Sequence, residues 1–297
     1  MQKMKDILFG CAVGDALGVP YEFKKRNSFE CSEFVGYGSH YQPRGTWSDD
    51  TSMTLCLADS IVNGFSYDDL AYRFLSWYFK GEYTANGDVF DIGIGTRNAL
   101  EKIKNGVNPI SAGGQDLYNN GNGSLMCISP IIFLTKKLQQ KERFELCKNV
   151  SSITHGHRIS IYACFLLEEF LYQLTITNDV KKSFLEVVKI KDGLENNSEF
   201  KDLNENLMNY SVSQIHSSGF CVDTLIASLW CLLTTNNYKD AVLKAVNLGD
   251  DTDTTGAVVG AVASFIYGYE NIPKEWIMDL RNKELINSIC NNFRAIN

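Results

Sequence analysis

The segment from Asn247 to Gly256, NLGDDTDTTG, is the feature that most restricts how this chain can fold. It places the carboxylates of Asp250, Asp251 and Asp253 among three threonines, directly before an apolar, small-residue run over residues 256–268 that predicts a tightly packed helix. Neighbouring carboxylates can be buried together only if their pKa values rise or a cation compensates their charge. For this segment alone, the simpler alternative is an N-cap whose acidic residues complement the helix dipole.

A second oxygen-rich helix start lies far earlier in the chain, in the segment Trp47–Thr54, WSDDTSMT. The apolar residues Met53, Leu57 and Ile61 follow at a spacing of four, and Gly64 is a stop signal. Hard cations bind carboxylate, hydroxyl and water oxygens, and a metal pair about 3.5 to 4 Å apart needs carboxylates from different segments. The two acidic segments together therefore predict a binuclear metal site.

Helical periodicity recurs along the chain and clear alternation of apolar and polar residues is scarce, which predicts an all-α fold. No linker is visible, so residues 1–297 are expected to form one domain. Segment 24–44 is expected to be a mobile loop. Segment 192–218 is expected to be a long surface excursion around a short helix. The expected helices cover residues 4–18, 67–79, 96–103, 161–174, 220–233, 238–246 and 256–268, with one or two closing helices between Lys274 and Ala295.

Charge and composition exclude several classes of function. The formal net charge of −7 argues against broad binding to nucleic-acid backbones. No segment approaches the roughly 18 uninterrupted apolar residues of a membrane span, and the N-terminus is too short in apolar length for a signal peptide. The nine cysteines are scattered without a C-x-x-C motif, which indicates a reducing compartment. We expect a cytoplasmic monomer that does not bind membranes.

Three acidic residues outside the two segments are candidates for roles at the same site. Aromatic neighbours surround Glu22 in the sequence VPYEF, a setting that raises a carboxyl pKa and suits acid–base catalysis, although a solvated loop residue fits equally. Asp15 lies on a strip that is otherwise apolar, either as an internal hydrogen-bond acceptor or behind the metals. Asp91 is either a cap or turn residue, or it faces the site.

Three further motifs bear on ligand binding. The glycines of Asn119–Pro130, NNGNGSLMCISP, offer backbone amides to a phosphate at a helix N-terminus, with a flexible turn as the alternative. His155 and His157 lack a third soft ligand for zinc, so a polar pocket wall is preferred, and Arg158 is positioned to contact an anion. The G-x-G of residues 93–95 has neither a third glycine nor a preceding strand, which argues against a dinucleotide site.

Taken together, six segments resemble the ADP-ribosylglycohydrolase family, which includes dinitrogenase-reductase-activating glycohydrolase and the ADP-ribosylarginine hydrolases. Their order and spacing match over nearly the whole chain. They are GDALGVPYE (14–22), WSDDTSM (47–53), DIG (91–93), GNGSLM (121–126), TH (154–155) and GDDTDT (249–254).

The resemblance implies a compact single-domain orthogonal helical bundle, with two Mg²⁺ or Mn²⁺ ions in a central site. The metal ligands that it implies are Ser48, Asp49, Asp50, Asp251, Asp253 and Thr254. The diphosphate and proximal ribose would lie on Gly121, Asn122, Gly123, Ser124, Leu125 and Met126, with His155 on the adenosine side. Asp91 would orient a guanidinium, and Glu22 or a metal-site aspartate such as Asp50 would accept a proton from water or steer the leaving group. Cys127 replaces an arginine that is frequent in the family, and Arg158 or Arg97 would have to compensate for its charge.

The implied activity is metal-dependent hydrolysis of the N-glycosidic bond between ADP-ribose and arginine on a modified protein, with ADP-ribose as product. Alternatives within the family are linkages to serine, to a nucleic-acid base or in O-acetyl-ADP-ribose, and a non-catalytic protein that binds metal or ADP-ribose. A calcium-binding module is a further alternative, because Asp251-x-Asp253-x-Thr255-Gly256 resembles the start of an EF-hand loop. Val262 stands where that loop needs its closing glutamate.

Overall fold

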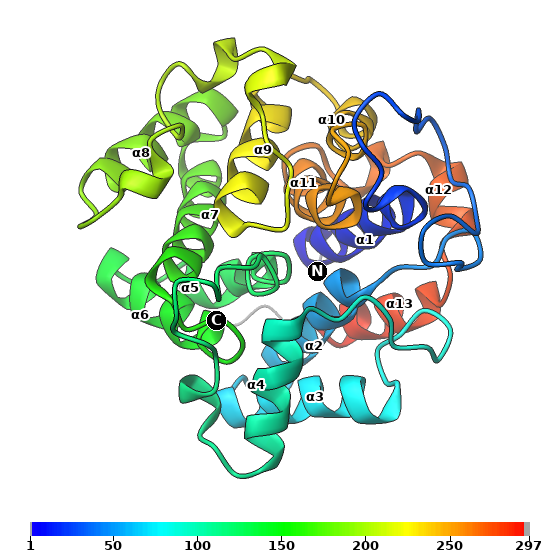
Figure 1. Cartoon of the computed structure of the whole chain (residues 1–297), viewed down its shortest axis with the longest axis vertical. Coiled ribbons are helices and arrows are strands. Elements are labelled where there is room, and N and C mark those ends of the chain that lie inside the picture. The colour runs from blue at the N-terminus through cyan, green and yellow to red at the C-terminus, as the bar shows by residue number, and fades with distance from the viewer. Residues whose placement is uncertain (1, 294–297) are drawn as a thin grey trace.

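A computed structural model describes residues 2–293 and contains thirteen α-helices, joined by loops and short 3₁₀ turns (Figure 1). No strand forms within these residues, where only two isolated bridges pair Gly114 with His155 and Gly121 with Phe220. The prediction of an all-α fold is therefore confirmed for the described part of the chain. The helices are α1 (Gln2–Gly18), α2 (Asp49–Val62), α3 (Tyr67–Lys80), α4 (Ile94–Lys104), α5 (Ile132–Thr135), α6 (Gln140–Ser151), α7 (Arg158–Thr177), α8 (Val180–Asp192), α9 (Cys221–Leu233), α10 (Tyr238–Val246), α11 (Thr252–Tyr267), α12 (Lys274–Asp279) and α13 (Lys283–Asn292).

Helix α1 packs along α11, and the two helices lie side by side in Figure 1. Small residues at a spacing of four line this contact, because positions i and i+4 share a helix face. A Cβ atom at Gly14 would overlap the carbonyl oxygen of Gly256, and one at Gly18 would overlap the backbone of Asp253. Glycine is thus required for the close approach that brings the end of α1 to the start of α11.

Helix α7 is long and apolar enough to cross a membrane by length and composition, with a mean hydropathy of 1.3. Inside the protein, however, 72% of that window is buried against other elements. Two adjacent glutamates, Glu168 and Glu169, lie within the helix and are fully buried. The core helix of a globular protein passes the same test of length and composition.

Three helices, α5, α6 and α8, were not predicted from the sequence. Helix α8 is amphipathic. The buried face of α6, in contrast, includes the charged side chain of Arg143. Arg143 donates two hydrogen bonds, of 2.8 and 2.9 Å, to Glu169 on α7. A charged residue on a buried face cannot be recognised without its partner.

The segment 192–218 also differs from the expected surface excursion, because Phe200, Leu203, Leu207 and Ile215 within it are buried in the core.

The long loop between α1 and α2 carries no strand, as expected, but it is tied to the rest of the protein. Arg26 donates hydrogen bonds to the carbonyl oxygens of Leu248 and Ile215, at 2.7 and 2.6 Å. The side chain of Asn247 pairs with both the amide and the carbonyl group of Cys31. The closing helices are α12 and α13, and the predicted end at Ala295 lies outside the described residues.

Candidate active site

Segments from both halves of the chain enclose a cavity of about 510 Å³. One end of its wall is acidic and the other is rich in glycine. The acidic end includes Glu22, Asp49, Asp91, Asp251 and Thr254. The glycine-rich end includes Gly95, Thr96, Gly121, Asn122, Gly123, Met126 and His155.

Asp15 fixes the start of α2. Its carboxylate accepts hydrogen bonds from the backbone amides of Ser48 and Thr51, all at 3.0 Å, and from the Thr51 hydroxyl at 2.6 Å. These amides belong to the N-terminal turn of α2, where helical donors have no partner within the helix. Burial raises the pKa of Asp15 to about 7, although these donors oppose the shift. Asp15 is therefore an internal acceptor that sits directly behind the predicted metal ligands.

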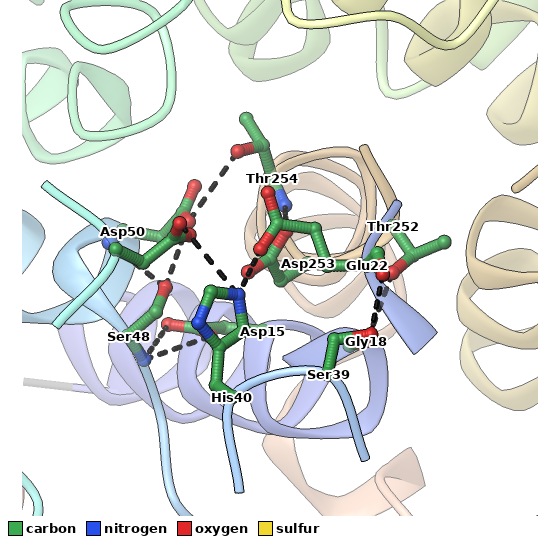
Figure 2. A network of polar contacts seen from close by, with 11 residues as sticks. Asp15, Gly18, Glu22, Ser39, His40, Ser48, Asp50, Thr252, Asp253 and Thr254 are labelled. Carbon is green, nitrogen blue, oxygen red and sulfur yellow. Dashed lines mark hydrogen bonds and ion pairs between the residues drawn. The ribbon is translucent and has the colours of Figure 1, made fainter. Parts of the chain in front are cut away.

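The two acidic segments meet at Asp50 (Figure 2). The Ser48 hydroxyl donates a hydrogen bond of 2.9 Å to Asp50 Oδ2, and the Thr254 hydroxyl donates one of 3.4 Å to the same oxygen. Thr252, at the start of α11, donates to the carbonyl oxygen of Gly18 at 2.8 Å and so holds α11 against the end of α1. The structure thus brings together segments that are separated by some two hundred residues in the sequence.

Several carboxylate oxygens in this cluster lack partners. Asp50 Oδ1, Asp251 Oδ1 and Asp253 Oδ2 are buried, and among the described residues none of them has a hydrogen-bond partner. Three carboxylate oxygens that could bind a metal all lie within 4.8 Å of one another, one each from Asp15, Asp50 and Asp253. Burial raises the pKa of Asp49, Asp50 and Asp253 well above the usual range, and repulsion between neighbouring carboxylates raises it further. Buried, unpaired oxygens of this kind fit a hard divalent cation, which would reverse the pKa shifts.

His40 is a residue of this site that the sequence analysis did not identify. Its Nε2 atom contacts Glu22 Oε2 and lies 3.6 Å from Asp91 Oδ1. Figure 2 shows the imidazole of His40 beside Glu22. Burial, followed by the charge of Asp251, raises the pKa of Glu22 to about 8. Burial and the charge of Glu22 raise the pKa of Asp91 to about 7. No local pattern around His40 indicates this role, because only the path of the loop carries it over the two acids.

The glycine-rich end of the cavity is built around His155. A Cβ atom would lie 3.1 Å from His155 Nε2 at Gly95, 3.4 Å from it at Gly121 and 2.8 Å from His155 Cε1 at Gly123. The absence of side chains at these positions leaves room for the ring and for a ligand beside it. Burial lowers the pKa of His155 to about 4, so the ring is neutral near pH 7, and Thr154 hydrogen bonds to its Nδ1 at 3.0 Å.

The turn from Gly121 to Met126 offers unpaired backbone donors. Among the described residues, the amides of Gly123, Ser124 and Leu125 have no backbone acceptor. Gly121, Asn122, Gly123 and Met126 of this turn line the cavity, whereas Ser124 and Leu125 are buried and do not. The turn leads into a 3₁₀ helix at residues 129–131 rather than directly into a long α-helix. Adjacent free amides of this kind form a concave site for an anion.

Asn122 connects the two ends of the cavity. Its side-chain amide donates a hydrogen bond of 2.8 Å to Asp251 Oδ2 and one of 2.9 Å to the Thr224 hydroxyl. Sequence reasoning assigned Asn122 to substrate binding only. The structure adds that it orients a predicted metal ligand, since one oxygen of Asp251 is bound and the other is left free.

Neither arginine proposed to compensate for Cys127 reaches the cavity. Arg158 hydrogen bonds to the carbonyl oxygen of Asn196 and lies 3.4 Å from Glu199, while Arg97 is exposed and outside the cavity wall. The Cys127 thiol lies 3.5 Å from the carbonyl oxygen of Ser124. An anion at this turn would therefore depend on backbone amides and not on a guanidinium.

The calcium-module alternative is contradicted by the fold. Helix α11 begins at Thr252, so residues Asp251 to Val262 are almost entirely helical and cannot form a twelve-residue calcium loop. The sequence around Gly93 and Gly95 leads into α4 with no strand before it, in agreement with the argument against a dinucleotide site.

Comparison with known proteins gives one consistent result. A family profile described as ADP-ribosylglycohydrolase matches residues 1–296. The chain is 36% identical to ADP-ribosylarginine hydrolase Tri1 of Serratia proteamaculans (strain 568), over 98% of this chain and 78% of that protein. It is 27% identical to ADP-ribosyl-[dinitrogen reductase] glycohydrolase of Rhodospirillum rubrum, over 92% and 88%. A solved structure described as an ADP-ribosylglycohydrolase-related protein complex superposes with a TM-score of 0.81 at 28% identity, covering 98% of this chain and 96% of that chain.

Proposed function

Because this chain belongs to the ADP-ribosylglycohydrolase family, we propose that it hydrolyses the N-glycosidic bond between ADP-ribose and arginine side chains of modified proteins. The observation that carries the proposal is the meeting of the two acidic segments at Asp50, with unpaired carboxylate oxygens beside it. Relatives at 35 and 36% identity over most of this chain are named ADP-ribosylarginine hydrolases, which supports arginine as the linkage.

The proposed cofactor is a pair of Mg²⁺ or Mn²⁺ ions. The donors in the cluster are carboxylate and hydroxyl oxygens, which suit hard cations better than zinc or copper. When bound, such ions lower the pKa of water and polarise sugar hydroxyls. The residues proposed to hold them are Ser48, Asp49, Asp50, Asp251, Asp253 and Thr254.

The carboxylates near Asp91 suit cleavage at an anomeric carbon. That reaction passes through an oxocarbenium-like transition state, which nearby negative charge stabilises. Glu22 has a pKa raised to about 8 without cations, so it is mainly protonated near pH 7 in that state. Bound divalent cations would lower this pKa, and the resulting carboxylate is proposed to take a proton from the attacking water. Asp91 is proposed to accept hydrogen bonds from the guanidinium of the arginine, since a planar fork matches a carboxylate. The His40 imidazole lies against these two acids in the structure.

The glycine-rich end is proposed to bind the rest of ADP-ribose. The free amide of Gly123, in the cavity wall, is suited to the diphosphate, and the amides of Ser124 and Leu125 next to it are also without a backbone acceptor. His155 is neutral and buried, so it neither repels a base nor attracts the phosphates strongly. This arrangement keeps the anionic diphosphate away from the acidic end of the cavity.

The partner is proposed to be an ADP-ribosylated protein, and the cell compartment the cytoplasm. All nine cysteines are buried and unpaired, which supports a reducing environment. Serine, nucleic-acid base and O-acetyl linkages remain rival substrates within the family, and we also propose that the protein acts as a monomer.

A panel of substrates tests the function. The purified protein is incubated with Mg²⁺ and with ADP-ribose linked to arginine, to serine, to a nucleic-acid base or in O-acetyl-ADP-ribose, and released ADP-ribose is measured. We expect release from the arginine conjugate, with little from the others, and none from the Asp251→Ala variant. Equal release by the wild type and Asp251→Ala from every substrate would refute the enzymatic function.

A further inference from the structure

The loop between α1 and α2 displays three exposed aromatic side chains, Phe23 in the cavity wall and Tyr37 and Tyr41 in the turn that carries His40, and we call them the aromatic rim. The exposed fractions of these side chains are 72%, 60% and 80%. Phe23 lines the cavity, and its ring lies 5.8 Å from that of His40. The rings of Tyr37 and Tyr41 contact each other edge-on at 5.6 Å. A single exposed ring needs no explanation, but three of them on the loop that supplies Glu22 and His40 to the site indicate an interaction surface.

The backbone holds these rings in place. Phe23, Tyr37 and Tyr41 have φ values of 64°, 68° and 56°, a left-handed conformation that bulky residues rarely adopt. This conformation is sterically unfavourable for a side chain with a Cβ atom, so the surrounding contacts must enforce it. The amide of Phe23 donates to the carbonyl oxygen of Asp250 at 2.7 Å, and the amide of Tyr37 donates to that of Gln42 at 2.7 Å.

The turn that carries Tyr41 is anchored in the same way. Its amide donates to the carbonyl oxygen of Gly38 at 3.2 Å, and a Cβ atom at Gly38 would overlap the backbone of Pro20. His40 in this turn reaches inward to Glu22 while its tyrosine neighbour is exposed. Rigid aromatic side chains lose little conformational entropy on binding, which is why they anchor protein interfaces.

The polarity of the cavity determines what the aromatic rim would contact. In the proposed function the diphosphate lies at the glycine-rich end, so the anomeric carbon and the leaving group lie at the acidic end. Glu22 and Asp91 line the same cavity as Phe23. An arginine that leaves through this end must be attached to a protein surface lying across the rim.

We propose that the aromatic rim is the docking surface for the folded protein that carries the modified arginine. This proposal rests on the proposed function. The rim then contributes to the recognition of the protein and not to cleavage of the bond, because Tyr37 and Tyr41 do not line the cavity.

The test compares two substrates with the same linkage, a folded protein ADP-ribosylated on arginine and free ADP-ribosylarginine. The variant is Tyr37→Asn/Tyr41→Asn, since asparagine tolerates the left-handed conformation. The control is Tyr72→Gln on α3, where the tyrosine is also 60% exposed. We expect kcat/KM of the double variant to fall about tenfold for the modified protein, because truncated interface aromatics commonly cost more than 1 kcal/mol. The value for free ADP-ribosylarginine should not change, and the control should match the wild type on both substrates.

Other results overturn the proposal. Equal losses on both substrates would mean that the tyrosines support the chemistry or the fold, and no loss on either would mean that the surface is not used. Self-association of the wild type in analytical ultracentrifugation, abolished by the double variant, would assign the surface to a second copy of the chain. If the wild type cleaves neither substrate, the proposed function itself fails, which differs from a wild type and double variant that cleave both equally.

Discussion

At the scale of single residues, the site is defined by charges that the protein alone does not balance. Asp50 is fully buried, and its Oδ2 atom accepts hydrogen bonds from two hydroxyl groups while Oδ1 has no partner among the described residues. Burial of a charge without compensation is costly, so this arrangement is stable only with a proton or a cation present.

The Asp50→Asn variant separates the stability of the fold from the binding of metal. An asparagine oxygen can accept the same hydrogen bonds from Ser48 and Thr254, and the variant removes one repulsive charge. We expect the metal-free variant to be more stable than the metal-free wild type by about 1–3 kcal/mol, and to lose most of its activity. Urea unfolding in the presence of a chelator measures the difference, and a metal-free variant less stable than the wild type would argue against charge repulsion.

The raised pKa of Glu22 predicts how stability changes with pH. Its pKa is about 8 in the folded protein and 4.5 in an unperturbed glutamate, so between these values the folded state binds more protons than the unfolded state. Stability from this group is fully present below about pH 4.5 and is lost as pH rises through 8. Thermal unfolding of the metal-free protein between pH 5 and 8 should therefore show a falling melting temperature, with a shallower slope for Glu22→Gln. An equal slope in both proteins would mean that Glu22 is not the group responsible.

At the scale of elements, the contact between α1 and α11 positions the acidic residues of both helices. Asp15 follows Gly14 in α1, and Asp253 lies three residues before Gly256 in α11. Since Gly14 and Gly256 set the distance between the helix axes, they also set the distance between the carboxylates.

The Gly14→Ala variant should separate the two helices. Alanine favours an isolated helix by about 1 kcal/mol over glycine, but overpacking a rigid core typically costs about 1–3 kcal/mol. The added Cβ meets backbone that cannot rotate away, so we expect net destabilisation together with weaker binding of Mg²⁺. Gly93→Ala is the control for stability, because an added Cβ there meets nothing within 4 Å. Calorimetry that shows equal melting temperatures for both variants would contradict the close-packing argument.

Helices α6 and α7 are joined by a buried ion pair. Arg143 binds Glu169 through two hydrogen bonds and lies 3.6 Å from Glu168, whose two oxygens have no hydrogen-bond partner among the described residues. Burial raises the pKa of Glu168 to about 8, so this residue is held mainly in its protonated form near pH 7.

Replacing Arg143 by methionine should leave Glu169 buried without its counter-charge. Removal of one partner of a buried pair costs about 3–5 kcal/mol, and we expect a loss of that size. On the same helix, Lys148 pairs with Glu145 at 3.1 Å, with both side chains nearly half exposed. Lys148→Met should change stability by less than about 1 kcal/mol, because exposed pairs contribute little. Denaturant unfolding of both variants makes the comparison, and similar losses would rule out burial as the reason.

At the scale of the whole molecule, the site joins parts of the chain that are far apart in sequence. Glu22 and His40 lie in one loop, Asp50 begins α2, and Asp253 lies in the first turn of α11. A cation bound at their junction would act as a cross-link that exists only in the folded state.

Divalent cations should therefore stabilise the protein in proportion to the logarithm of their concentration. Ligand binding at 100 times its dissociation constant contributes about 2.7 kcal/mol per site. We expect Mg²⁺ or Mn²⁺ to raise the melting temperature of the chelator-treated wild type and to leave that of Asp251→Ala nearly unchanged. A similar rise in the variant would indicate general salt effects instead of a specific site.

The sequence by itself determined the local features of this protein. The spacing of apolar residues predicted most of the helices, and the acidic residues with threonines marked the starts of α2 and α11, because helix periodicity and capping depend on neighbours within about four residues. The motifs also indicated the family over nearly the whole chain. Even so, α6 remained unpredicted, since the charge of Arg143 on its buried face is balanced only by a residue on another helix.

Only the tertiary structure decided which side chains meet. It brought the Thr254 hydroxyl to Asp50, the His40 imidazole to Glu22 and the Asn122 amide to Asp251. These contacts depend on how closely α1 and α11 pack and on where the loops between helices run. Such distances depend on the packing of the whole core. A local sequence pattern therefore does not predict them.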